Sequence, residues 1–202
     1  MHTLYTVGHS QHPIEHFINL LKDHDIDYVI DVRSTPYSKF AADYNKENIQ
    51  KILSTYNISY AHMGKCFGAR QENLDLYTPE GYLDFEKVIA SANFQMGLEN
   101  VMKGMETHKI ALMCLEKKPC DCHRAIMVAN GFYKAGCTVE HILEDSSIQT
   151  HKELNKELMD KYFPNRFQLS LFDMNEEIDY LKEAYRLRNK EIGYYITERK
   201  VV

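Results

Sequence analysis

The sequence predicts an α/β fold: a mainly parallel five-stranded sheet with helices on both faces, Rossmann-like or flavodoxin-like, plus a helical C-terminal extension. Two observations lead to this prediction. Over the first three quarters of the chain, short apolar runs alternate with amphipathic stretches of helical length. Strand–helix–strand units of this kind require right-handed crossovers, which place the strands parallel. The pattern changes after Asp145, so we divide the chain into an α/β domain, residues 1–148, and a helical extension, residues 149–202.

The predicted strands are five apolar runs bounded by turn residues or helical patterns. They are residues 4–8, 28–32, 58–63, 109–116 and 138–143. The fourth run, KIALMCLE, carries the strongest strand signal, whereas the third is the weakest.

The predicted helices follow from apolar residues that recur at a spacing of three and four. Pro13 opens the first, in which Ile14, Phe17, Ile18 and Leu21 share one face. The others contain residues 49–53 with a cap at Asn45, 82–105 with a break near Ser91, 122–134 with a stop at Gly136, 154–162 and 176–190.

Composition is typical of a globular protein with a sizeable core. The chain has 202 residues, of which 44% are hydrophobic and 26% are charged, and its net charge is −5. No apolar run approaches the ~18 residues of a membrane helix, and the first residues do not resemble a signal peptide. Five cysteines, three of them within nine residues, favour catalysis or metal binding over a disulfide framework. We therefore expect a cytoplasmic protein without a membrane partner, and broad electrostatic coating of DNA is disfavoured.

Polar and reactive residues follow the predicted strands, at the points where the strands end. In a parallel sheet these ends share one edge, where ligands bind. Ordinary turns favour Gly, Asn, Asp, Ser and Pro rather than histidine, arginine and cysteine. We therefore expect one functional site at this edge, built from His9, Ser10, Arg33, Ser34, Lys65, Cys114 and Glu116.

The segment CLEKKPCDCHRA carries the most specific signal. It places Cys122, His123 and Arg124 in the predicted first turn of a helix, where free N–H groups attract anions and favour a thiolate. Cys114 or Cys122 is then the nucleophile or thiolate, and His123, His9 or Glu116 transfers protons. Two alternatives remain open: structural packing, and a metal held by Cys114, Cys122 and His123. We predict no metal or other cofactor, because the spacing is not a standard zinc pattern.

Two further segments suggest a phosphate cradle. DVRSTPYSKF supplies Arg33 and Ser34, and GKCFGAR supplies Lys65 and Arg70 beside two glycines. With Arg124, these residues predict a locally basic edge that binds the phosphate of a substrate. Asp31 could instead neutralise Arg33, and Glu116 could be the ion-pair partner of an arginine.

These motifs, TVGHS, DVRSTPYS, HMGKCFGAR and CLEKKPCDCHR, together resemble a family catalogued as domain of unknown function 488. The resemblance covers about residues 3–145. It implies that Cys120 stands at a variable position. It also singles out site positions at Cys114, Glu116, Cys122, His123, Arg124, His9, Ser10, Arg33 and Ser34.

The C-terminal extension contains a second resemblance. Residues 168–172, QLSLF, resemble the pentapeptide with which bacterial polymerases and repair proteins bind the sliding clamp. Gln168 would orient the peptide, and Leu171 and Phe172 would fill an apolar pocket. Alternatively, the apolar residues pack against the domain itself.

Together these features predict an enzyme that acts on a phosphate-bearing substrate, a nucleotide or nucleic acid, in DNA repair if the extension binds the clamp. One alternative is a binding module without catalysis that recognises a nucleotide or nucleic-acid end. The other is a metal or redox protein that uses the clustered thiols.

Overall fold

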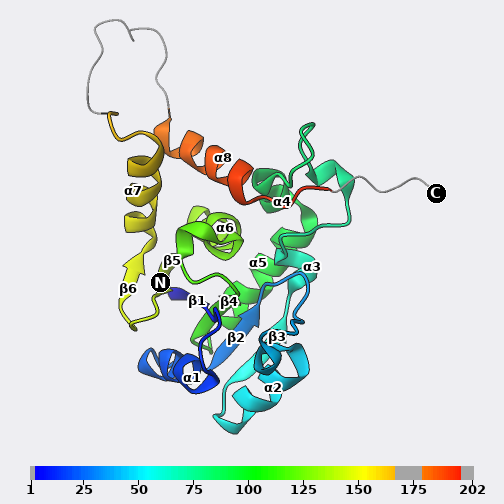
Figure 1. The fold of residues 1–202 in the computed structure, drawn as a ribbon, viewed down its shortest axis with the longest axis vertical. Coiled ribbons are helices and arrows are strands. Elements are labelled where there is room, and N and C mark those ends of the chain that lie inside the picture. Colours follow the sequence, from blue (N-terminus) through cyan, green and yellow to red (C-terminus); the bar gives the residue numbers. More distant parts are fainter. Residues whose placement is uncertain (1–2, 167–178, 197–202) are drawn as a thin grey trace, which may run out of the picture.

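The computed structural model describes residues 3–166 and 179–196, and its centre is a six-stranded sheet with the order β3-β2-β4-β1-β5-β6 (Figure 1). Five of these strands are parallel, and the short sixth strand runs antiparallel to β5. The strands are β1 (Thr3–Gly8), β2 (Tyr28–Asp31), β3 (Ser59–His62), β4 (Ile110–Cys114), β5 (Thr138–Ile142) and β6 (Ile148–Thr150). The predicted fold class is confirmed, and β6 adds an edge strand that spans the proposed 148/149 boundary.

Helices cover both faces of the sheet, and alternating strand residues divide the core between the two faces. Ala111 and Met113 of β4 pack towards α1 (Ile14–Asp23) and α2 (Lys46–Thr55). Leu112 and Cys114 pack on the other side. That side is covered by α4 (Phe85–Ala90), α5 (Ala92–Gly104), the π-helix η4 (Arg124–Ala129) and its continuation α6 (Asn130–Lys134). The remaining helices are α3 (Gly64–Phe67), α7 (His151–Tyr162), α8 (Tyr180–Ile192) and the 3-10 turns η1 (Ala42–Tyr44), η2 (Leu74–Leu76) and η3 (Pro119–Asp121).

Helix ends follow the sequence closely, with one exception. Ser91 ends α4 and caps α5 by accepting a hydrogen bond from the backbone N–H of Phe94, so the predicted break is confirmed. Gly136 has a φ of 92° after α6, as the predicted stop requires. Asn45 is the N-cap residue of α2, as predicted, but its side chain accepts from the backbone N–H of Ser38 and so leaves the helix without a side-chain cap.

A buried hydrogen-bond chain joins the C-terminal helices to the sheet. Thr6 of β1 contacts His141 of β5 at 2.8 Å, and His141 contacts His151 of α7 at 3.1 Å. The hydroxyl of Tyr185 in α8 lies 3.1 Å from His151 and donates to Asn155 at 2.6 Å. Residues 149–166 and 179–196 therefore pack as part of the same body as the sheet.

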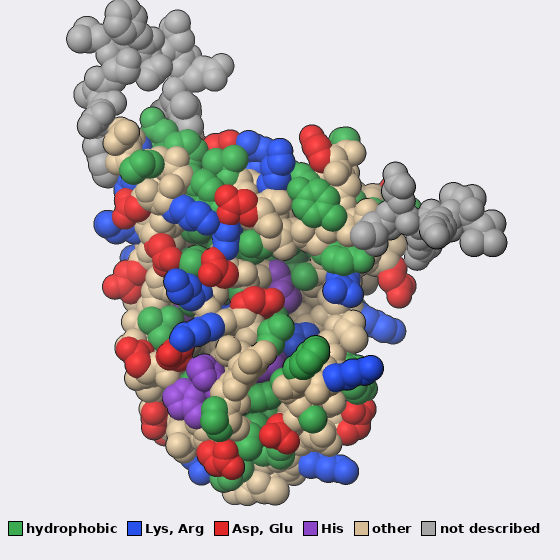
Figure 2. All heavy atoms as spheres, in the orientation of Figure 1, with side chains coloured by type: hydrophobic (Ala, Val, Ile, Leu, Met, Phe, Trp, Pro, Cys, Tyr) green, Lys and Arg blue, Asp and Glu red, His purple; other side chains and the backbone are tan. Residues whose placement is uncertain are grey.

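Charged side chains of both signs are interspersed over the face shown in Figure 2. Among the described helices, none is long and apolar enough to cross a membrane.

The topology places a ligand-binding crevice at the carboxyl end of β4. The connections that leave β1 and β2 pass through α1 and α2 on one face, whereas the connection that leaves β4 passes through η4 and α6 on the other. In the sheet, β4 lies between β1 and β2. The connection that leaves β4 and the connections that leave its two neighbours therefore run over opposite faces. Such switch points open the crevice in which ligands of α/β sheets bind.

Candidate functional site

A cavity of about 450 Å³ lies at this edge, and six of the predicted site residues line it. These six are Arg33, Ser34, Arg70, Cys114, Glu116 and His123. The other residues of its wall are Thr35, Tyr37, Ala69, Leu115, Ile192 and Tyr194. The convergence expected from the strand ends is therefore present for residues contributed by β2, β4, the loop after α3 and the start of η4.

Four reactive side chains meet beside the cavity, and three of them line it. We call Cys114, Glu116, Cys122 and His123 the thiol–carboxylate cluster. Glu116 Oε2 lies 3.0 Å from Cys114 Sγ and 2.8 Å from Cys122 Sγ. Cys114 Sγ lies 3.6 Å from His123 Nδ1. One atom from each of the four side chains falls within 4.8 Å of the others. The strand ends at Cys114, so Glu116 reaches the cluster from the loop that follows β4.

His123 is held in one orientation by the strand next to it. Its Nε2 lies 3.1 Å from the carbonyl oxygen of Val32 and can only donate to it. In the neutral ring Nδ1 is then the unprotonated nitrogen, and it faces Cys114.

The pKa of each group in the cluster depends on burial and on the charges of its neighbours. Burial raises the pKa of the Cys114 thiol and of the Glu116 carboxyl, and the nearby sulfur of Cys122 raises that of Glu116 further. Burial also opposes ionisation of Cys122, but the hydrogen bond with Cys114 and the charge of Arg124 outweigh it and hold the Cys122 pKa well below its usual value. Burial lowers the pKa of His123, yet its contacts with Cys122 and Glu116 raise it overall. These directions favour a thiol at Cys114 and a thiolate at Cys122, with a Glu116 carboxyl that ionises less readily than an exposed one.

Arg124 contacts the cluster from the protein interior and does not line the cavity. Its side chain is fully buried, and its guanidinium donates to the carbonyl oxygens of Glu116 and Lys117. Its backbone N–H points to Cys122 Sγ at 3.4 Å. Arg124 therefore fixes the loop after β4 and supplies a positive charge next to the thiolate.

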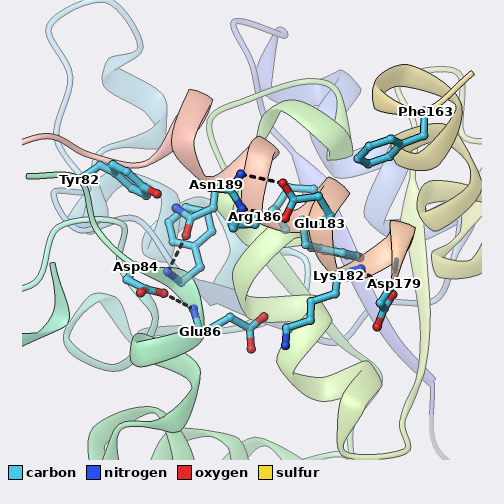
Figure 3. Close-up of a pocket in the computed structure, with 12 residues that line it drawn as sticks. Tyr82, Asp84, Glu86, Phe163, Asp179, Lys182, Glu183, Arg186 and Asn189 are labelled. Atoms are coloured by element: carbon cyan, nitrogen blue, oxygen red, sulfur yellow. Dashed lines mark hydrogen bonds and ion pairs between the residues drawn. The ribbon is translucent and has the colours of Figure 1, made fainter. Parts of the chain in front are cut away.

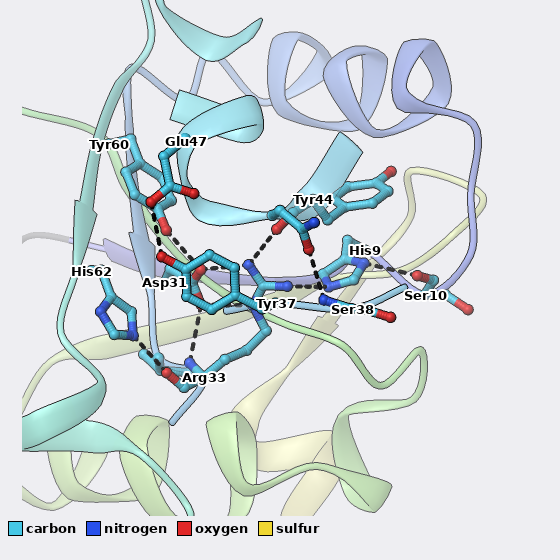
Figure 4. Close-up of polar contacts among 12 residues, drawn as sticks. His9, Ser10, Asp31, Arg33, Tyr37, Ser38, Tyr44, Glu47, Tyr60 and His62 are labelled. Atoms are coloured by element: carbon cyan, nitrogen blue, oxygen red, sulfur yellow. Dashed lines mark hydrogen bonds and ion pairs between the residues drawn. The ribbon is translucent and has the colours of Figure 1, made fainter. Parts of the chain in front are cut away.

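Arg33 forms the buried ion pair with Asp31 that the sequence left open as an alternative (Figure 4). Its guanidinium donates to both carboxylate oxygens of Asp31, at 2.9 and 2.6 Å, and to the carbonyl oxygen of Tyr44. Tyr60 adds a hydrogen bond to the same carboxylate. The charge of Arg33 is thus compensated inside the protein, although the residue still lines the cavity.

His9 packs behind Arg33 as a neutral side chain. Its Nδ1 lies 2.7 Å from the carbonyl oxygen of Ser10, and its Nε2 accepts from Arg33 at 3.2 Å. Burial and then the positive charge of Arg33 lower the pKa of His9 to about 4. His9 therefore orients Arg33 and does not line the cavity.

The rim of the cavity brings together the two segments that predicted the phosphate cradle. Ser34 Oγ accepts a hydrogen bond from the backbone N–H of Arg70 at 2.8 Å. Gly68 permits this contact, because a Cβ atom there would lie 2.5 Å from Ser34 Oγ. The guanidinium of Arg70 lies over the ring of Tyr194, 4.7 Å from its centroid. Arg70 is the exposed cation of the cavity wall.

Five predicted residues lie beside the cavity and do not line it: His9, Ser10, Lys65, Cys122 and Arg124. Lys65 is exposed on α3, and Cys122 lies behind Glu116 within the cluster. Gln168, Leu171 and Phe172 fall outside the described residues. Ile192 and Tyr194 were not predicted, and nothing in their sequence indicates that the end of α8 reaches the cavity.

Helix α8 also holds the turn that precedes Cys122. Arg188 is buried, donates from Nε to the carbonyl oxygen of Cys120 at 2.7 Å, and pairs with Asp121 and Glu191. Arg188 thereby fixes η3, the turn from which the chain enters the cluster.

A larger cavity of about 860 Å³ lies between α4 and α8 (Figure 3). Asn189 bridges the two sides, because its side chain accepts from the backbone N–H of Phe85 and donates to the carbonyl oxygen of Leu83. None of the predicted site residues lines this cavity, so we place the candidate site at the smaller one.

Comparison with known proteins gave one match. No curated protein and no solved structure matched the chain. A family model described as "Domain of unknown function DUF488" matches residues 13–130. The matched segment is more than half of the chain and contains the whole thiol–carboxylate cluster. The chain therefore belongs to the DUF488 family.

Proposed function

We propose that this chain is an enzyme that acts on a phosphate-bearing substrate, a nucleotide or nucleic acid, with the thiol–carboxylate cluster as its reactive centre. One observation carries the proposal: the four side chains of the cluster converge, and three of them line a cavity at the topological switch point. Buried groups with coupled charges in such a position are typical of catalytic sites.

The wall of the cavity supports a phosphate-bearing substrate. Arg70 offers an exposed guanidinium, whose planar fork matches phosphate oxygens. Ser34 Oγ accepts from the backbone of Arg70, so its own hydroxyl proton can be donated to an anion. Tyr194 and Ile192 provide an apolar wall against which a base can pack.

Glu116 and His123 are the groups that would move protons at a bound substrate. Both line the cavity, the raised pKa of Glu116 moves its titration towards neutral pH, and contacts with Cys122 and Glu116 raise the pKa of His123. Cys114 is the sulfur that lines the cavity, and Cys122 is the thiolate behind it.

Binding tests the substrate class first. Nucleoside 5′-monophosphates and a short 5′-phosphorylated DNA strand would be titrated calorimetrically beside their unphosphorylated counterparts. We expect the phosphorylated probes to bind more tightly, and Arg70→Ala to weaken them by about 10- to 100-fold, the usual value of a charge-assisted hydrogen bond. Lys51→Ala, an exposed cation of α2, is the matched control. Equal affinity for both kinds of probe would exclude a phosphate-bearing substrate.

Turnover then separates an enzyme from a binding module. The tightest probe would be incubated with the protein and followed by chromatography and phosphorus NMR. We expect Glu116→Gln and His123→Asn to lose about 10²-fold or more of the rate, which is more than any change in probe affinity or melting temperature accounts for. If losses of rate only follow losses of stability, the catalytic roles are wrong. Binding without any turnover would favour the non-catalytic module.

Binding to a sliding clamp, and with it a role in DNA repair, remains a proposal that rests on the sequence of residues 168–172. A pulldown with a bacterial sliding clamp would compare the unaltered chain with Leu171→Ala/Phe172→Ala. We expect the double variant to lose binding, because these two side chains are the apolar anchors of the motif. Equal capture of the two proteins would remove the clamp from the proposed function.

A further inference from the structure

The thiol–carboxylate cluster contains the donor set of a metal site. Two thiols, an imidazole nitrogen and a carboxylate oxygen are the groups that bind zinc in proteins. Here one such atom from each of Cys114, Cys122, His123 and Glu116 lies within 4.8 Å of the other three. Among the described residues, no other group of three or more such side chains converges in this way.

The separations between the donor atoms bracket the distances in a tetrahedral site. Zinc bonds of about 2.3 Å to sulfur and 2.0 Å to nitrogen or oxygen imply donor–donor distances of roughly 3.3–3.8 Å in a tetrahedron. Cys114 Sγ and His123 Nδ1 lie 3.6 Å apart, within this range. Glu116 Oε2, at 3.0 and 2.8 Å from the two sulfurs, would retreat by roughly half an ångström to admit an ion.

The groups around the cluster also fit a metal site. Metal-bound histidines usually donate a hydrogen bond from the second ring N–H to a carbonyl or carboxylate oxygen, and this bond fixes the orientation of the ring. His123 Nε2 meets the carbonyl oxygen of Val32 in this way and turns Nδ1 towards the sulfurs. The backbone N–H of Arg124 points to Cys122 Sγ, as an N–H group does when it supports a metal-bound thiolate.

Charge gives an independent argument. Three acidic side chains are crowded into a buried site, and both sulfurs lie within 3.0 Å of one carboxylate oxygen. A divalent ion at this point would place a positive charge among these acidic groups, beside the buried guanidinium of Arg124.

We infer that Cys114, Cys122 and His123 bind a zinc-type divalent ion, with Glu116 completing a tetrahedral site on the side of the cavity. The sequence spacing C-x7-C-H differs from standard zinc patterns because Cys114 comes from a strand end and the other two ligands from a helix start. Of the ligands, Cys114, Glu116 and His123 line the cavity, so the ion would face a bound substrate.

The inference deepens the proposed function and rests on it only for the role that the ion would have in the reaction. In the metal-bound protein, Glu116 and His123 would be ligands of the ion rather than carriers of protons. An ion at this position would polarise a phosphoryl or carbonyl oxygen, or activate a water molecule that replaces Glu116. Metal binding can be measured without substrate. A protein that binds phosphorylated probes but no ion would refute this inference alone, and one that binds the ion but no phosphorylated probe would refute the proposed substrate class alone.

The test uses the full chain without a histidine tag, purified without chelator and under reducing conditions. Elemental analysis should find close to one zinc per chain. After removal of the metal, titration with Co²⁺ should give the absorption of a tetrahedral ion and a thiolate-to-cobalt charge-transfer band, both saturating at one equivalent. Zinc should also raise the melting temperature of the metal-free protein, because it binds the folded state.

Variants assign the ligands. Cys114→Ser, Cys122→Ser and His123→Ala should each weaken Co²⁺ binding by about 100-fold or more, and Glu116→Gln by about 10-fold. Cys120→Ser and Cys137→Ser, which alter thiols outside the cluster, should bind as the unaltered chain does. The inference fails if the unaltered chain takes up less than about a tenth of an equivalent or shows no charge-transfer band, and both results are independent of whether a variant folds. It fails equally if the two control variants lose the metal.

Discussion

At the scale of single residues, the cluster depends on buried charges that are held in fixed positions. Arg124 is fully buried, and its guanidinium donates to two backbone carbonyls in the loop after β4. Arg33 is fixed by Asp31 of β2, by the carbonyl oxygen of Tyr44 in η1, and by His9 after β1. These contacts pair the terminal nitrogens of both guanidinium groups, whereas Arg124 Nε is buried without a hydrogen-bond partner among the described residues. They place two cations at the cluster and its wall.

The ion pair between Arg33 and Asp31 predicts an asymmetric response to mutation. Asp31→Ala should lower the free energy of unfolding by about 3–5 kcal/mol, because it leaves Arg33 buried without a counter-charge. Urea denaturation would measure the change. The double variant Asp31→Leu/Arg33→Met should be less destabilised than Asp31→Ala alone.

Tyr60→Phe is the control for this pair, because it removes one hydrogen bond to Asp31 and leaves the charges in place. It should cost about 1 kcal/mol. If Asp31→Ala costs no more than Tyr60→Phe, the pair does not hold this part of the site.

Gly8 gives a second prediction at this scale. A Cβ atom at Gly8 would lie 2.0 Å from the backbone oxygen of Glu116, a distance that no side chain tolerates. Gly8→Ala should therefore displace the loop after β4 and cost at least about 2 kcal/mol of unfolding free energy. At Gly104 the nearest atom is the flexible end of Ile110, at 3.2 Å, so Gly104→Ala should cost much less. Equal melting temperatures for the two variants would contradict the close contact.

At the scale of elements, the sequence predicted strands and helices where local signals are strong. Residues 110–114 are all buried, so β4 appears in the sequence as an uninterrupted apolar run. Strand β6 was not predicted, because it has only three residues, Ile148–Thr150, and lies at the edge of the sheet with β5 as its neighbour. The order of the strands could not be predicted either, since local patterns contain no information about which crossovers pass over which face.

The same distinction applies to the candidate site. Cys114, Glu116 and His123 could be predicted because each stands next to the end of an element, and parallel strands bring such ends together. The geometry of Cys122, behind Glu116 and outside the cavity wall, depends on the turn η3. Tyr194 could not be predicted, because its place against Arg70 results from packing of α8 on the domain.

Helix α8 yields the prediction that belongs to this scale. Arg188→Ala removes the hydrogen bond to Cys120 and the ion pair with Asp121, and should loosen η3. Labelling of Cys120 and Cys122 by iodoacetamide, mapped by mass spectrometry, should become about 10- to 100-fold faster, as expected for the loss of a charged hydrogen bond. Arg188→Lys should restore part of the protection.

Arg186→Ala is the matched control, because Arg186 lies on the same helix and forms its ion pair with Glu183 at the surface. It should leave the labelling rates near those of the unaltered chain. Equal rates for Arg188→Ala and Arg186→Ala would show that α8 does not position the turn.

At the scale of the whole molecule, the buried chain from Thr6 to Asn155 joins three layers: the sheet, α7 and α8. Its hydrogen bonds have one consistent direction. Tyr185 donates to Asn155, so it accepts from His151, which accepts from His141, which accepts from Thr6. Both histidines must be neutral for this order, because an added proton would set two donors against each other.

Acid should therefore weaken the attachment of the C-terminal helices. Burial lowers the pKa of His151 to about 4 and holds that of His141 well below its usual value. In the unfolded chain these side chains take up protons near pH 6.5, whereas the folded chain does not until about pH 4 for His151. The stabilisation by neutral His151 is thus present above pH 6.5 and is lost as the pH falls towards 4.

Urea unfolding between pH 7.5 and 4.5 would measure this loss, and His151→Gln isolates one histidine. The amide of Gln can accept from His141 and donate to Tyr185, yet it does not titrate. The free energy of unfolding of the unaltered chain should fall with decreasing pH by about 2–3 kcal/mol more than that of His151→Gln. Only this difference is diagnostic, because the raised pKa of Glu116 acts in the opposite direction in both proteins. Exposed His108, changed to Gln, controls for the loss of a histidine. The free energies of unfolding of His151→Gln and His108→Gln are then compared over the same pH range. If they show the same pH dependence, the buried hydrogen-bond chain does not couple protonation to the packing of α7 and α8 on the sheet.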